Sequence, residues 1–266
     1  MEQQRGARPG TECFRFLVVA LALIGLPALA QPPAPDGDAS AAPIYASKNT
    51  LGIIGAYSWN SSHILLGDAE HRMLLEMGGS YSRRLLLTHI VNWQYDGELL
   101  PVALESDPLT YYLNQETSPV EETSSGILPE SPVTCTPLTV VYSYTVNNVN
   151  YSGTETEGCS GRQWTVGEAI SPVGMRWNFL PARKLQPFVL GHGGYMYTTR
   201  PIPVEGAGNF NFTFDIGAGV EIFHSRSRSL RVEYRYHHIS NKDTAPLNPG
   251  IDNGLLQVTY CFGFGH

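Results

Sequence analysis

The sequence predicts an all-β fold, an antiparallel transmembrane β-barrel of about eight strands with a long external loop. Three observations favour this class. Segments of ten or more residues alternate apolar and polar side chains, which is typical of strands with two different faces. The number of such segments is even. Short connections alternate with long ones along the chain, as they do in bacterial outer-membrane barrels.

The alternation is clearest in "NFNFTFDIGAGVEI", residues 209–222. Phe210, Phe212 and Phe214 lie on one face of such a strand, opposite Thr213 and Asp215. A soluble sandwich also alternates, but its strands are nearer 5 or 6 residues long. After the N-terminal segment, no apolar run approaches the roughly 20 residues of a membrane helix. If the chain crosses a membrane, we therefore expect a closed barrel, in which every backbone N–H and C=O group in lipid can form a hydrogen bond.

The same pattern predicts the strand positions and the orientation. The expected strands are residues 51–60, 71–82, 86–98, 168–180, 186–199, 208–223, 230–240 and 254–264. The fifth is ambiguous, because "PFVLGHGGYMY" does not separate into two faces. Residues 82–84, 181–184 and 224–229 are predicted as short turns on the periplasmic side. With both termini on that side, the loops at 99–167 and 241–253 face the cell exterior.

The positions predicted to point into the barrel carry mixed charges and amides. We interpret them as a paired network, because side chains fill the interior of a small barrel. They support the barrel and predict no chemistry. These positions are Arg72, Glu76, Asn92, Gln94, Asp96, Arg176, Asp215, Glu221, Glu233 and Arg235.

The N-terminus is typical of an exported protein. Residues 1–30 are predicted as a signal peptide cleaved after Ala30, because basic residues precede the apolar "FLVVALALIGLPALA". Residues 31–48 read as a flexible leader rich in Pro, Ala and Asp, and 49–266 as the outer-membrane barrel. The chain has 17 basic and 24 acidic residues, a net charge of −7. That balance argues against a nucleic-acid partner.

Residues 100–165 break the barrel pattern and are rich in Thr, Ser, Glu and Pro. We predict an extracellular loop insertion here, with a small hairpin at "LTVVYSYTVNNVNYSG". In an oxidising compartment Cys135 and Cys159 are expected to form a disulfide, worth roughly 3 kcal/mol in the chain-entropy account. Cys261 alternates to the inside of the last strand.

The last hairpin places polar groups on its lipid-facing side. Tyr236, His238 and Ser240 share that face, and Asp252 has the same parity on the next strand. A neutral imidazole takes the proton of a neighbouring serine, and a carboxylate holds the ring in the required tautomer. The bland interpretation is a strand end that runs into a polar loop. His237 points to the opposite face from His238, so the two predict no metal site, and no metal or organic cofactor is expected.

The stretch "HISN" at 238–241, followed by "NPGID" at 248–252, resembles the active-site motif of the PagL-type lipid A 3-O-deacylases. The similarity is strongest over residues 231–252, and the barrel pattern extends it across the chain. It implies an outer-membrane carboxylic ester hydrolase with a triad on the outer surface of the barrel.

The resemblance also assigns roles to individual residues. His238 matches the general base, Ser240 the nucleophile and Asp252 the acid. Asn241 matches the residue assigned to the oxyanion hole, and Asn248 matches a supporting asparagine. Two features depart from the family. Its acid is often Glu, so the shorter Asp252 must lie closer to the histidine, and the predicted external loop exceeds what a minimal deacylase barrel needs.

The residues alone leave two other classes of protein open. One is a noncatalytic OmpA-like structural or adhesive barrel whose external loop does the work. The other is a soluble lipocalin-like binder with apolar residues inside its barrel. The resemblance favours an outer-membrane esterase that removes an ester-linked acyl chain from lipid A of lipopolysaccharide. The expected partners are lipid A and the other lipids of the outer membrane. Outer-face aromatic residues suit contact with lipid or with a second copy, so the oligomeric state is left open.

Overall fold

The computed structural model describes residues 44–265. The predicted signal peptide, residues 1–30, and most of the predicted leader, 31–48, lie outside these residues. Within the described range the one helix is a short 3-10 turn, η1 (Glu205–Ala207). None of the described residues forms a helix long and apolar enough to cross a membrane.

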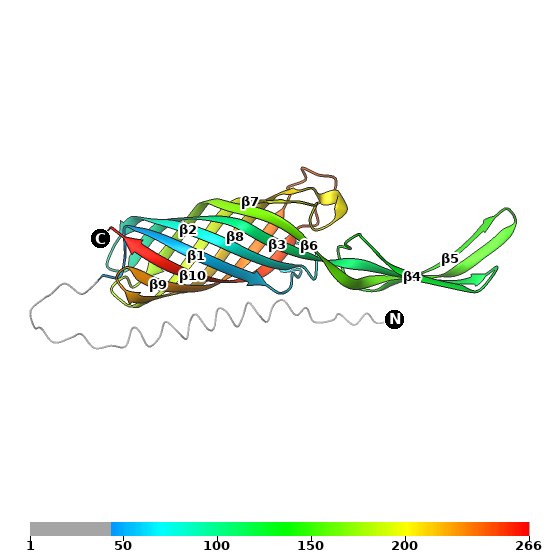
Figure 1. The fold of residues 1–266 in the computed structure, drawn as a ribbon, viewed down its shortest axis with the longest axis horizontal. Coiled ribbons are helices and arrows are strands. Elements are labelled where there is room, and N and C mark those ends of the chain that lie inside the picture. Colours follow the sequence, from blue (N-terminus) through cyan, green and yellow to red (C-terminus); the bar gives the residue numbers. More distant parts are fainter. Residues whose placement is uncertain (1–43, 266) are drawn as a thin grey trace, which may run out of the picture. The chain divides into compact units, whose positions relative to one another are not determined.

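The described residues form ten antiparallel strands, eight of which close into a barrel (Figure 1). The sheet order is β4-β3-β2-β1-β10-β9-β8-β7-β6-β5, and an additional pairing of β3 with β6 closes the ring. The predicted all-β barrel of about eight strands is confirmed. The strands are β1 (Asn49–Ser58), β2 (Met73–Leu87), β3 (Val91–Ser118), β4 (Glu122–Leu128), β5 (Leu138–Val146), β6 (Val149–Phe179), β7 (Leu185–Thr198), β8 (Phe210–Ser225), β9 (Arg228–Ser240) and β10 (Ile251–Phe264).

Each predicted barrel strand is present, but one predicted turn is wrong. Residues 82–84 lie within β2, which stays paired with β3 as far as Leu87. The chain turns instead at residues 88–90. There the Thr88 hydroxyl oxygen accepts the backbone N–H groups of Ile90 at 3.2 Å and Val91 at 2.9 Å. A threonine that satisfies backbone donors in this way favours a turn, whereas basic residues alone do not end a strand.

Strand β7 was ambiguous in the sequence because both of its faces carry apolar residues. Phe188, Leu190 and Met196 are buried inside the barrel. Val189 and Tyr195 are exposed on the outside. The inner face therefore mixes apolar with polar side chains, so the sequence shows no clean alternation of polarity.

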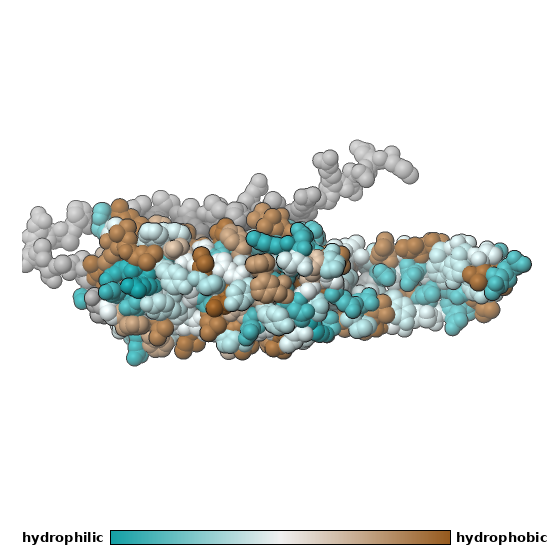
Figure 2. Space-filling model, turned by 90° about the horizontal axis from the view of Figure 1, so that it is seen from above, coloured by the Kyte–Doolittle hydropathy of each residue, from teal (hydrophilic) through white to brown (hydrophobic). Residues whose placement is uncertain are grey.

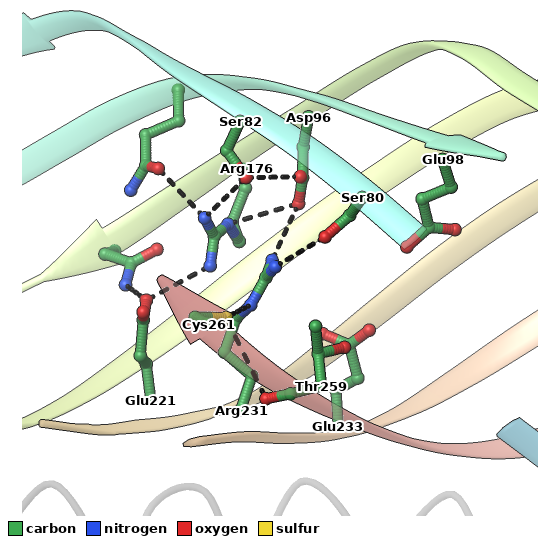
Figure 3. Close-up of polar contacts among 12 residues, drawn as sticks. Ser80, Ser82, Asp96, Glu98, Arg176, Glu221, Arg231, Glu233, Thr259 and Cys261 are labelled. Atoms are coloured by element: carbon green, nitrogen blue, oxygen red, sulfur yellow. Dashed lines mark hydrogen bonds and ion pairs between the residues drawn. The ribbon is translucent and has the colours of Figure 1, made fainter. Parts of the chain in front are cut away.

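The lumen is filled by a network of charged and polar side chains (Figure 3). All ten residues predicted to point inward are buried. Figure 3 shows Arg176 and Arg231 converging on Asp96, with N–O distances of 3.2 and 3.1 Å. Charges removed from water are costly unless they are paired and hydrogen-bonded, and these are. Cys261 also points inward, 3.0 Å from Arg231 Nε.

The outer surface of the barrel is apolar. Alternate residues of β8 and β10 are exposed and are almost all aromatic or aliphatic. On the face drawn in Figure 2, hydrophobic residues are spread over the barrel, with hydrophilic patches between them. An apolar exterior around a polar interior is the arrangement of a membrane barrel and the reverse of a lipocalin-like binder.

The predicted external loop is regular β-structure. β3 and β6 remain paired beyond the ring, from Pro108 opposite Arg162 to Ser118 opposite Ser152. β4 and β5 flank them, so that four strands form an extension of the barrel wall (Figure 1). We call residues 108–162 the extension. The strands of the extension could not be predicted from alternation, because exposed Thr, Ser and Glu residues occupy both of their faces.

Two local predictions in the extension are confirmed. The hairpin joining β5 to β6 turns at Asn147 and Asn148, which both have positive φ, as a tight hairpin turn requires. A disulfide joins Cys135 to Cys159. It ties the connection between β4 and β5 to strand β6.

Candidate active site

A histidine and an aspartate face each other on the outer side of the last hairpin. His238 of β9 and Asp252 of β10 are directly opposite each other in the strand register. His238 Nδ1 lies 2.7 Å from Asp252 Oδ1. A direct cross-strand pair has its Cβ atoms only about 4.5–5.5 Å apart, so the shorter aspartate reaches the ring.

The Asp252 carboxylate is fully buried and accepts four hydrogen bonds. Its Oδ1 also accepts from the Tyr236 hydroxyl at 2.8 Å, and the Tyr236 and His238 rings are stacked 9° from parallel. Its Oδ2 accepts the backbone N–H groups of Leu65 at 2.7 Å and Leu66 at 2.8 Å. The carboxylate is thereby fixed in place. No pattern in the sequence predicted the two backbone donors, which lie in the connection between β1 and β2.

Two glycines allow this close packing. A Cβ atom on Gly67 would lie 2.6 Å from the Asp252 backbone nitrogen, closer than real Cβ contacts. Gly250 has φ of +62°, and a Cβ there would lie 3.2 Å from His238 Cε1. Positive φ and tight space both favour glycine. The backbone at Gly67 and at Gly250 therefore packs directly against the Asp252–His238 pair.

Ser240 lies two residues after His238 on the same face of β9, and both side chains are partly exposed. In an extended strand this spacing separates the Cα atoms by roughly 6–7 Å. The Ser240 hydroxyl donates to Asn248 Oδ1 at 3.0 Å and accepts from the Lys242 N–H at 3.2 Å. Among the residues that the structure describes, no hydrogen bond joins Ser240 to His238.

The two predicted asparagines organise the connection between β9 and β10. Asn248 Oδ1 accepts from the Asn241 backbone N–H at 3.1 Å as well as from the Ser240 hydroxyl. Asn241 Nδ2 donates to the Ala207 carbonyl oxygen and, at 2.7 Å, to that of Leu247. An amide nitrogen has two hydrogens, so both are used. The side chain of Asn241 thus fastens this connection to η1.

Arg72 lies at the same end of the barrel and binds the segments around η1. Its buried guanidinium pairs with Asp107 at 3.0 Å and donates to the carbonyl oxygens of Val133 and Pro203 at 2.9 and 3.0 Å. Burial lowers the pKa of the Arg72 side chain, and the Asp107 carboxylate opposes that shift. These bonds hold the segments around η1 to the barrel, and η1 in turn holds Asn241.

The arrangement suits proton transfer. When His238 is neutral, a proton on Nδ1 is shared with Asp252, and Nε2 is left as an acceptor. The Ser240 side chain would have to rotate away from Asn248 for its hydroxyl to reach that acceptor. Catalytic hydrogen bonds are often unformed before substrate binds. The groups present are those of acyl transfer by a serine, a histidine and an acid.

A second cluster lies inside the barrel and is separate from this site. Glu98, His192 and Asp215 are buried, and their ligand-type atoms lie within 4.8 Å of one another. Arg235 already donates to both oxygens of Glu98, at 2.8 and 2.6 Å. We therefore interpret the cluster as part of the ion-pair network that fills the lumen.

The C-terminal part of the chain matches a known family. Residues 137–260 match the family model described as Lipid A 3-O-deacylase (PagL). The resemblance to the PagL family is confirmed. The matched segment contains His238, Ser240 and Asp252, and it covers β5, four strands of the ring in full (β6 to β9) and most of β10. The predicted enzyme class, an ester hydrolase of the lipid A 3-O-deacylase type, is that of the family.

The matches among solved structures include a PagL structure. A crystal structure of the outer membrane enzyme PagL is 13% identical, covering 80% of this chain and 99% of that chain, with a TM-score of 0.44. An outer membrane channel, COG4313, from Pseudomonas putida F1 is 10% identical, with coverages of 86% and 99% and a TM-score of 0.25. LpxR from Salmonella typhimurium is 8% identical, with coverages of 81% and 100% and a TM-score of 0.25. No curated protein matches the chain.

Proposed function

We propose that the protein is an outer-membrane esterase that hydrolyses an ester-linked acyl chain from lipid A, with Ser240, His238 and Asp252 as its triad. The observation that carries the proposal is the His238–Asp252 pair on the lipid-facing surface of the barrel, with Ser240 two residues along the same face. The family match of this segment supports the reaction class.

In the first half of the reaction Ser240 Oγ attacks the ester carbonyl carbon. Its proton passes to His238 Nε2, and Asp252 stabilises the imidazolium that forms. The tetrahedral intermediate then loses the sugar oxygen, which takes the proton back from His238. An acyl chain is left esterified to Ser240.

In the second half a water molecule replaces the sugar hydroxyl. His238 takes one proton from the water as its oxygen attacks the acyl carbonyl. Collapse of the second intermediate breaks the bond to Ser240 Oγ, which regains its proton from His238. The products are a free fatty acid and lipid A with one acyl chain fewer.

We assign the oxyanion to Asn241, through its backbone N–H rather than its side chain. Both hydrogens of Asn241 Nδ2 are taken by backbone carbonyl groups, whereas the backbone N–H lies next to Ser240 and bonds the side-chain oxygen of Asn248, which the oxyanion would have to displace. A donor aimed at the developing oxyanion stabilises the intermediate. Asn248 has the supporting role of holding Ser240 and this N–H together before substrate arrives.

The location of the site fits a substrate that arrives within the membrane. Tyr234 and Tyr236 are partly exposed on the same face as His238 and Ser240. A lipid approaching sideways in the outer leaflet keeps its acyl chains in the bilayer while the ester meets Ser240. We accordingly propose the outer membrane as the protein's location and lipid A as its partner.

Mass spectrometry of lipid A tests the proposal. Cells making the wild type are expected to contain lipid A lighter by one acyl chain, and cells making Ser240→Ala are expected to contain the unmodified form. Heat-modifiable migration of both proteins in detergent gels provides the folding control. Unmodified lipid A in cells with folded wild-type protein would remove the deacylase assignment and favour a noncatalytic barrel.

A further inference from the structure

The connection between β1 and β2 forms a strap over the outer end of β10. We call residues 61–69 the strap. Its Ser61 and Ala69 make bridges to Asn253 and Ile251, and the Ser62 N–H donates to the Asp252 carbonyl oxygen at 3.2 Å. The Asp68 and Ala69 N–H groups donate to the carbonyl oxygens of Pro249 and Gly250 at 2.6 and 3.0 Å. The strap is thus held to the barrel at both ends.

The tip of the strap presents two leucines away from the protein. His63 Nδ1 lies 3.1 Å from the Gly67 carbonyl oxygen and closes the turn. Leu65 and Leu66, between them, are 73% and 65% exposed. Their backbone N–H groups meanwhile bind Asp252. Exposed leucine side chains gain free energy when hydrocarbon covers them.

The strap also lies against the histidine. The position that a Cβ would occupy on Gly250 is 3.2 Å from His238 Cε1 and 3.4 Å from Gly67 Cα. The edge of the imidazole and the end of the turn are therefore close neighbours. An ester held at Ser240 and His238 would therefore have the strap as its neighbour on this side.

We infer that Leu65 and Leu66 bind the acyl chain that is released and thereby set the preference for acyl-chain length. The inference rests on the proposed function, because it needs an ester whose acyl part lies beside His238. Each methylene that the leucines cover favours binding. A long chain contacts both side chains, whereas a short chain ends before it reaches them.

Contact between the acyl chain and the two leucines of the strap has a second effect. The residues that contact the chain also supply the two N–H groups that hold Asp252. A bound chain therefore stabilises the strap in the position that fixes the acid. Leu65 and Leu66 act as specificity residues through their side chains and as positioning residues through their backbone.

Purified protein in detergent micelles provides the test. The substrates are two synthetic 3-O-acyl glucosamine phosphates whose single ester-linked chain has four or fourteen carbons. We compare the ratio of kcat/KM for the long ester to that for the short ester. Leu65→Ser/Leu66→Ser is expected to lower this ratio about tenfold relative to the wild type. The substitutions keep both backbone N–H groups.

A matched variant at the other end of the barrel controls for surface polarity. Leu85 and Leu86 are 48% and 52% exposed near the turn at residues 88–90, and Leu85→Ser/Leu86→Ser is expected to keep the wild-type ratio. An active wild type with an unchanged ratio in Leu65→Ser/Leu66→Ser overturns this inference alone. A wild type as inactive as Ser240→Ala on both esters overturns the proposed function itself.

Discussion

Strand β9 carries two neighbouring histidines, and each pairs with an aspartate on a different face of the barrel. His237 points inward to Asp215, and both side chains are 4% exposed. His238 points outward to Asp252 and is 14% exposed. The inner pair lies beside Arg235, which also pairs with Glu233, whereas the outer pair lies on the outer face of the barrel with Ser240 two residues along the same strand. The same pair of side chains is enclosed by the lumen network on one face and reaches the outer surface on the other, where the proposed substrate would meet it.

Substitution of the two histidines tests the difference between the two faces most directly. His238→Ala is expected to lower the deacylation rate about 10³- to 10⁴-fold, because it removes the base and the proton donor. Release of fatty acid from lipid A by purified, folded enzyme is the measurement.

His237→Gln is the matched control, since it changes the neighbouring ring without touching the outer face. Its rate per folded molecule is expected to stay within about twofold of the wild type. Equal losses in the two variants would contradict the assignment of different roles to the two faces.

The two aspartates extend the comparison. Asp252→Asn is expected to lower the rate about 10²- to 10⁴-fold, because the amide no longer selects the tautomer that leaves Nε2 free. A pre-steady-state measurement of acyl-enzyme formation shows whether attack is the step that is slowed. Asp215→Asn should leave that step near its wild-type rate and lower the urea concentration at which the barrel unfolds.

Removal of a charge inside the barrel should affect folding more than chemistry. Asp96→Ala leaves Arg176 and Arg231 buried without their shared carboxylate. We expect a loss of about 3–5 kcal/mol in the free energy of unfolding, measured by urea titration in lipid vesicles. Glu121→Ala, which removes an exposed carboxylate, is expected to change it by less than about 0.5 kcal/mol. A similar loss in both would show that the lumen network contributes little.

A smaller effect is expected where the backbone holds the outer pair. Gly67→Ala inserts a methyl group where none fits and pushes the N–H groups of Leu65 and Leu66 away from Asp252. We expect about a tenfold fall in rate, which corresponds to about 1.4 kcal/mol. Gly55→Ala is the control, because a Cβ at Gly55 meets no atom within 4 Å. Equal rates in the two variants would show that the strap does not position the acid.

The smallest effect on deacylation is expected from the disulfide. Cys135→Ser/Cys159→Ser should leave the rate within about twofold of the wild type, because neither cysteine contributes a group to the outer pair. Limited proteolysis should cut the extension of the variant faster than that of the wild type. A large loss of activity would instead assign the extension to substrate binding.

The barrel could be predicted from the sequence because a membrane imposes opposite polarity on its two surfaces. Phe212 and Asp215 report that polarity directly. In the extension, Thr139 and Glu155 lie on strands with solvent on both faces, so no alternation marks them. The contrast has a physical cause, since period-2 patterning records a difference between two environments and not the strand itself.

The site was predictable to the extent that it depends on side chains of one hairpin. Strand parity permitted a pairing of His238 with Asp252, the family resemblance implied it, and the register places the two residues opposite each other. The N–H donors of Leu65 and Leu66 could not be predicted, because every residue except proline has a backbone N–H. Only the tertiary structure decides which of these groups reach the Asp252 carboxylate. The hydrogen bonds from the Asn241 side chain to two carbonyl groups could not be predicted for the same reason.

The enclosure of Cys261 bears on the redox chemistry of the protein. Its thiol is 1% exposed in the packed lumen, while Cys135 and Cys159 are bonded in the extension. Thiol–disulfide exchange requires the attacking sulfur to reach a disulfide along a clear path. In the folded protein the odd cysteine is kept out of that exchange, so oxidising conditions leave a single pairing among the described cysteines.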